Sequence, residues 1–249
     1  MSDQTAEKID DDRATEMAES LSARTLDLWL ARGAVLAIVA LQLLLVNDLT
    51  PFPRWVMPTL EVLLLAPLAV ATAWTLGKTK RVADAEDPSD FWATVTRYRH
   101  LVRVAFLVLT GLVSVANLIA LNGLVWAILA GHAANGKSLL IDSLNIWATN
   151  LIIFALWYWN IDRRSAYFGE DAQPDFVFTQ QTLPQSLTRR VYTPGFVDYL
   201  FLAFTNATAF SPSDTFPLTA RAKLLMMLQA LISLVTIALV AARAVGILS

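Results

Sequence analysis

The chain has 249 residues, of which 56% are hydrophobic and only 16% are charged, with no cysteine and a formal net charge of −2 at pH 7. In soluble domains about a quarter of the residues are charged. The low charged fraction of this chain and its mean hydropathy of +0.52 therefore indicate a membrane protein. The absence of cysteine excludes disulfides, thiolate metal sites and cysteine nucleophiles. The slightly negative net charge argues against a nucleic-acid partner.

Residues 1–28 are rich in acids and start unlike a signal peptide, so we interpret them as a cytoplasmic tail. Apolar stretches then recur along the chain, and helices of this length suit the roughly 30 Å hydrocarbon core of a bilayer. Five stretches are found: Leu30–Val46, Val56–Leu76, Leu101–Leu129, Leu139–Trp159 and Lys223–Leu248. We therefore predict an all-α membrane protein with four transmembrane helices in 29–160, a long loop at 161–218 and a last transmembrane helix in 219–249.

The basic residues between these stretches predict an orientation. The tail and the two long connections, 77–100 and 161–218, hold twelve Lys and Arg residues, whereas the short connections 47–55 and 130–138 hold two. Lys and Arg accumulate on the cytoplasmic side of membrane proteins. The prediction is a multi-pass protein of the cytoplasmic (inner) membrane, with the N-terminus inside and the C-terminus outside.

The long loop contains a shorter apolar segment, Phe196–Phe210, in the stretch DYLFLAFTNATAFSPSD. As a helix the 15 residues 196–210, which begin with Phe196 and Val197 just before that stretch, would measure about 22 Å, too short to span the bilayer. Pro212 and Pro217 prevent a smooth continuation into the last helix. We predict a half-helix at 196–210 that is re-entrant and leads into a polar loop. The alternative is an interfacial helix that lies flat on the cytoplasmic face.

Two groups of polar residues are candidate functional sites. The pore or loop candidates lie in the last part of the half-helix and in the polar loop after it: Thr205, Asn206, Thr208, Ser211 and Asp214. A polar stripe runs along one face of the last helix: Gln229, Ser233, Thr236 and Arg243. Such a stripe either lines a water-filled path or packs against neighbouring helices through hydrogen bonds.

Glu61 and Arg243 are the clearest ionisable residues inside the predicted spans. Each lies about 7 to 8 Å below the same predicted interface, at 1.5 Å per residue. A buried carboxylate and a guanidinium offset part of each other's desolvation when they meet. We therefore expect Glu61 and Arg243 to form a buried pair, with snorkelling of Arg243 as the alternative.

Enzymatic motifs are missing from the sequence. Neither His100 nor His132 belongs to an H-E-x-x-H arrangement, and no helix carries a paired-aspartate protease pattern. We predict no catalytic residue, no metal site and no cofactor.

Two resemblances bear on function. The segment Tyr199–Thr208, followed by Asp214-Thr215-Phe216-Pro217, is similar in outline to the pore loop of two-helix potassium channels. The glycine-rich filter of that family is replaced here by Thr208-Ala209-Phe210-Ser211-Pro212-Ser213, which argues against a potassium-selective filter. More specifically, the motifs FALWYW at 154–159 and TNATAFSP at 205–212 resemble those of an uncharacterised family of bacterial integral membrane proteins. That resemblance implies a fold and a membrane location rather than an activity.

Two classes of function therefore remain open from the sequence. The first is a pore-loop, channel-like or transport protein that passes ions or a small polar solute. The alternative is a non-transport membrane protein that binds lipid or another membrane protein. The expected partner is the lipid bilayer, and whether the chain forms a homo-oligomer is left open.

Overall fold

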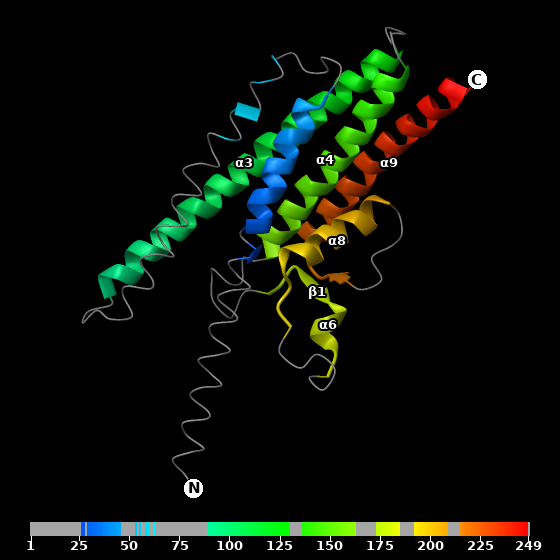
Figure 1. Cartoon of the computed structure of the whole chain (residues 1–249). Coiled ribbons are helices and arrows are strands. Elements are labelled where there is room, and N and C mark those ends of the chain that lie inside the picture. The colour runs from blue at the N-terminus through cyan, green and yellow to red at the C-terminus, as the bar shows by residue number, and fades with distance from the viewer. Residues whose placement is uncertain are drawn as a thin grey trace.

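Helices dominate the computed structural model (Figure 1). It describes residues 26–27, 29–45, 53, 55, 58–59, 62, 89–129, 136–162, 173–184, 192–208 and 215–248. Side chains are described from residue 103 in the first long helix, from 137 in the second, and at 220–242, 244 and 245 in the last. The predicted span Val56–Leu76 lies almost entirely outside the described residues.

Three long helices form the body of the protein. They are α3 (Ser89–Leu129), α4 (Gly136–Asp162) and α9 (Ala220–Leu248). Each contains a segment long and apolar enough to cross a membrane: Arg103–Leu129, Lys137–Asp162 and Ala220–Ala242. These segments coincide with three of the five predicted stretches. A shorter apolar helix, Trp29–Leu43, lies where the first predicted span was placed.

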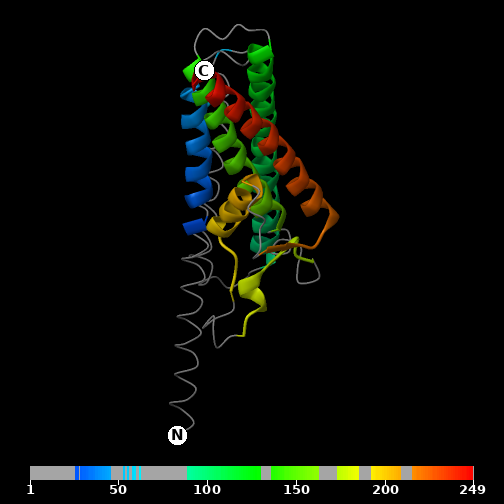
Figure 2. The same cartoon turned by 90° about the vertical axis from the view of Figure 1, so that its right-hand side faces the viewer.

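Helix α4 is the centre of the bundle and packs against α3, α9 and the short helix α8 (Phe196–Ala207). The apolar segment of α4 is 67% buried, whereas that of α9 is only 22% buried. Figure 2 shows α9 crossing α4 obliquely, with α8 beside them. Most of the surface of α9 therefore faces outwards, and its outward residues are largely apolar.

The helices run in alternating directions. The Trp159 ring of α4 contacts Phe106 of α3, and the Trp157 indole N–H donates to the Ser114 hydroxyl (2.9 Å), so α3 is antiparallel to α4. Helix α9 begins beside the end of α4 and finishes at the opposite end of the bundle (Figure 1). The hydroxyls of Thr110 and Thr236 donate to carbonyls one turn earlier in their own helices, so these side chains sit in apolar helices without needing water.

A short two-stranded antiparallel ribbon accompanies the helices. Strand β1 (Phe176–Phe178) pairs with β2 (Thr215–Pro217), with Val177 opposite Phe216, and the short helix α6 (Thr179–Thr182) follows β1. Strands of three residues are too short to show an alternating pattern in the sequence. Two boundaries also differ from the prediction: α8 ends at Ala207 rather than at residue 210, and α4 continues to Asp162, inside the predicted loop.

Candidate functional site: a buried polar junction

Helix α8 begins with a capped turn. Gly195 is the N-cap residue, and its backbone N–H donates to the Asp198 carboxylate (2.7 Å). The Tyr192 hydroxyl donates to the other oxygen of Asp198 (2.5 Å), while the Phe196 N–H donates to Asp27 (3.0 Å). These contacts satisfy backbone donors at the start of α8 and place negative charge at its N-terminus, where the helix dipole favours it.

Helices α4, α8 and α9 meet in a cluster of three polar side chains, Tyr158, Asn206 and Gln229, which we call the polar triad. The Tyr158 hydroxyl and the Asn206 amide both donate to the Gln229 carbonyl oxygen, at 2.5 and 2.8 Å. The Gln229 amide donates to the Ala203 carbonyl (2.8 Å), and that of Asn206 to the Met226 carbonyl (3.0 Å). Tyr158 and Gln229 are fully buried, so the triad ties the three helices together with polar groups that serve one another.

A second group of polar residues fastens the ribbon to the ends of α4 and α9; we call it the ribbon anchor. The buried Asp162 carboxylate accepts the backbone N–H groups of Asp175 (2.6 Å) and Phe176 (3.0 Å) through one oxygen. Its other oxygen accepts the Tyr199 hydroxyl (2.5 Å). All three partners donate, as suits a carboxylate that can only accept. One side chain thus joins α4 to α8 and to β1.

The ribbon anchor also contains an ion pair. The Asp175 carboxylate, only 1% exposed, accepts two parallel hydrogen bonds from Arg221 at the start of α9, both 2.6 Å. It also accepts the Thr219 hydroxyl, and the Asp175 carbonyl accepts the Leu218 N–H (2.9 Å). A bidentate guanidinium–carboxylate pair is geometrically specific, so it holds β1 in register with the first turn of α9.

Aromatic rings fill the space between the triad and the anchor. The Phe176 ring lies 5.3 Å from Tyr158 and 6.4 Å from Tyr199, and Phe178 lies 5.2 Å from Tyr199, all edge to face. Edge-to-face contacts of this kind add about 0.5–1.5 kcal/mol each beyond the area they bury. The triad, the anchor and these rings together form one buried junction at a single end of the bundle.

The predicted loop candidates lie in three places: in the triad, in α8 and its last turn, and outside the described residues. Asn206 is a member of the triad. The Thr205 hydroxyl donates to the Phe201 and Leu202 carbonyls, and that of Thr208 donates to Phe204 and Thr205, all within α8 or its last turn. These two hydroxyls therefore face their own helix. Ser211 and Asp214 lie outside the described residues.

Three members of the predicted stripe on α9 lie on one buried face. Gln229 belongs to the triad, the Ser233 hydroxyl accepts the Asn150 amide (3.3 Å), and Thr236 bonds the Ile232 carbonyl. The bonds of Gln229 and Ser233 join α9 to α4 and α8. The side chain of Arg243 and all of Glu61 lie outside the described residues, so the Glu61–Arg243 pair stays a prediction.

Several residues of the junction were not singled out from the sequence: Tyr158, Asp162, Asp175, Tyr199 and Arg221. An aromatic run followed by charge, as at Tyr158 and Asp162, is typical of a membrane boundary, so the local sequence favours an interfacial belt over a buried junction. One available signal was that Asp162, Asp175 and Arg221 lie in or next to the predicted loop 161–218, and therefore on one predicted side of the membrane. Opposite charges at one level are candidates for pairing.

The described residues contain no group of three or more His, Asp or Glu side chains that could hold a metal ion. Helical content and three long apolar helices make this chain compatible with the class of integral membrane proteins. Comparison with protein families, curated proteins and solved structures finds no match.

Proposed function

We propose that the chain is a multi-pass, non-enzymatic and non-transport membrane protein that binds lipid or another membrane protein through its outward helix faces. The observation that carries this proposal is the closure of the polar junction. Gln229 and Asn206, the polar residues best placed to line a path, spend their hydrogen bonds on each other, on Tyr158 and on backbone carbonyls. The threonines of α8 bond their own helix.

The experiment that tests this proposal is a flux measurement on purified protein in liposomes. We expect potassium, sodium and small polar solutes to cross no faster than in protein-free liposomes, with a pore-forming peptide as the positive control. Asn206→Ala should leave this result unchanged. The non-transport proposal would be overturned if the wild type and Thr236→Val supported flux and Asn206→Ala abolished it. That result would favour the pore-loop alternative.

The proposed topology has five crossings, with the N-terminus in the cytoplasm and the C-terminus outside. Asp27 contacts Phe196 at the junction end, whereas the Leu41 carbonyl accepts the Asn145 amide (2.6 Å) nearer the other end of α4. Helix α3, which is antiparallel to α4, also runs from the junction end towards the other end of the bundle. The helix at 29–43 and α3 thus run in the same direction along the bundle, which supports the proposal of one further crossing between them, at 56–76.

Reporter fusions test the proposed topology. We expect a reporter at residue 90 to be active in the cytoplasm and one after residue 249 to be active outside, because an odd number of crossings separates the two termini. A fusion after residue 184, at the far end of the ribbon, should report the cytoplasm as well. Cytoplasmic activity of all three fusions would rule out the five-crossing arrangement.

A further inference from the structure

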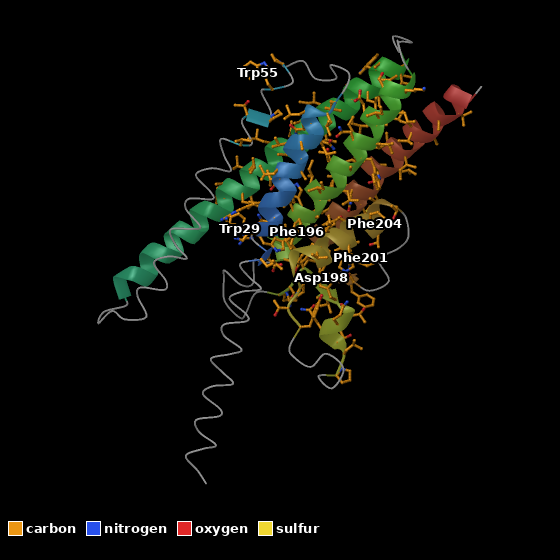
Figure 3. All side chains as sticks on the ribbon, viewed as in Figure 1. Trp29, Trp55, Phe196, Asp198, Phe201 and Phe204 are labelled. Atoms are coloured by element: carbon orange, nitrogen blue, oxygen red, sulfur yellow. The ribbon has the colours of Figure 1, made fainter. Side chains whose placement is uncertain are left out.

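Helix α8 is apolar on both of its faces. Its inner face packs into the junction through residues that include Phe196, Tyr199 and Leu202. On the outer face Val197, Phe201 and Phe204 are 59%, 49% and 45% exposed. Their spacing of four and three residues places them on one stripe, which we call the outer stripe, and Figure 3 labels its two phenylalanines along α8. A helix that is apolar all round belongs in a protein core or in a membrane.

The described polar groups of α8 have partners within the protein. Asp198 caps the helix and accepts the Tyr192 hydroxyl, while Tyr199 donates to Asp162. Thr205 bonds backbone carbonyls of its own helix, and Asn206 belongs to the triad. Polar groups in the hydrocarbon region have to be satisfied internally, and α8 meets that requirement with its outer stripe free of polar atoms.

The chain enters and leaves the bundle at the same end. At the start of α8 the Phe196 ring lies 6.0 Å from Trp159, close to the end of α4, whereas Phe204 lies 6.4 Å from Trp147. Trp147 precedes Trp159 by about 18 Å along the axis of α4, at 1.5 Å per residue. Thr215 is then back at the junction end, where it pairs with Phe178. Helix α8 therefore dips from the junction end towards the middle of α4, and β2 lies at the junction end again.

We infer that α8 is a re-entrant half-helix whose outer stripe contacts the acyl chains of the membrane leaflet on the junction side. The inference rests on the proposed membrane location and names the partner of this face. Lipid is the occupant that fits, because the outer face of α9 beside it is also exposed and apolar, including Leu224, Met227, Leu228 and Leu231. The triad bonds α8 directly to this part of α9. One apolar surface thus extends from the half-helix to a long helix.

Spin-label accessibility in liposomes tests the inference, and the cysteine-free chain needs no background mutations. Single cysteines replace Val197, Phe201 and Phe204, with Leu231→Cys and Leu234→Cys as references on the outer face of α9. Thr182→Cys, in exposed helix α6, serves as the aqueous reference. We expect labels at 197, 201 and 204 to collide with oxygen several times more often than with a water-soluble nickel complex. The label at 204 should lie deeper than that at 197, by at most about 10 Å.

Three other labelling results would contradict either the lipid contact of α8 or the proposed membrane location. Nickel-accessible labels on α8, with oxygen-accessible labels on α9, would overturn the lipid contact and place α8 on the aqueous surface. Labels on α8 that neither reagent reaches would overturn it in favour of a protein partner, such as a second copy of this chain. Nickel-accessible labels on both helices would contradict the proposed membrane location itself. The three stripe positions are exposed, and variants that elute as a single species in gel filtration are the ones compared.

Discussion

Asp162→Ala should lower the free energy of unfolding by roughly 3–6 kcal/mol, since each buried polar group left without a partner costs about 1–3 kcal/mol. The substitution strands two backbone N–H groups, of Asp175 and Phe176, together with the Tyr199 hydroxyl. A loss of this size is a large fraction of the roughly 5–15 kcal/mol that stabilise a typical protein. Thermal or denaturant unfolding in detergent, followed by near-ultraviolet circular dichroism, measures it.

Tyr199→Phe is the matched control for Asp162→Ala. It removes one of the three hydrogen bonds and leaves the carboxylate with its two backbone donors, so we expect a loss of about 1.5–3 kcal/mol. The loss for Asp162→Asn should lie between those of the other two variants, because the amide keeps one oxygen acceptor while its NH₂ group faces hydrogen-bond donors. An alanine variant that unfolds like the wild type would mean that Asp162 does not hold the ribbon in place.

Gln229→Leu should lower the free energy of unfolding by roughly 2–4 kcal/mol. The substitution removes the acceptor of Tyr158 and Asn206 and the donor to the Ala203 carbonyl. Single interhelical hydrogen bonds in membranes average only about 0.6 kcal/mol. The larger value is expected because three groups, of which Tyr158 and the Ala203 carbonyl are buried and Asn206 is half-buried, lose a partner at once. Unfolding in detergent again measures the change.

Thr236→Val is the control on the same buried face. The Thr236 hydroxyl donates to the carbonyl of Ile232 in its own helix, and valine has nearly the same shape, so we expect a change below about 0.5 kcal/mol. A double-mutant cycle sharpens the test. Tyr158→Phe should destabilise the wild type and be neutral or favourable in the Gln229→Leu background, where the hydroxyl has lost its acceptor. Additive losses would show that Tyr158 and Gln229 are not coupled.

The long helices were predictable from the sequence because a continuous apolar run is a local property. Leu101–Leu129, Leu139–Trp159 and Lys223–Leu248 each coincide with a helix long and apolar enough to cross a membrane. A short apolar helix before the last span was also predictable, since Pro212 and Pro217 follow an apolar segment too short to span a bilayer. The predicted ends of α8 and α4 differ from the observed ones, because α4 continues to Asp162, whose hydrogen bonds to Asp175 and Phe176 involve residues farther along the chain.

The members of the junction were harder to predict because their partners lie far apart in the chain. Asn206 and Gln229 were candidates as polar residues in apolar surroundings, but nothing local pairs them with Tyr158. The ribbon consists of strands of three residues separated by α6 and α8. Its pairing depends on Asp162, Asp175 and Arg221 meeting at one end of the bundle, and no sequence periodicity encodes such a meeting.

The sequence by itself determined which segments are apolar helices and which residues are too polar to face lipid alone, because both follow from composition and spacing along the chain. Only the tertiary structure decided where those polar residues point. Gln229 and Ser233 could equally have lined a path or joined two helices, and the rotation of α9 against α4 and α8 turned them inwards to Asn206 and Asn150. That rotation is set by the packing of whole helices, in which each hydrogen bond depends on side chains from distant parts of the chain.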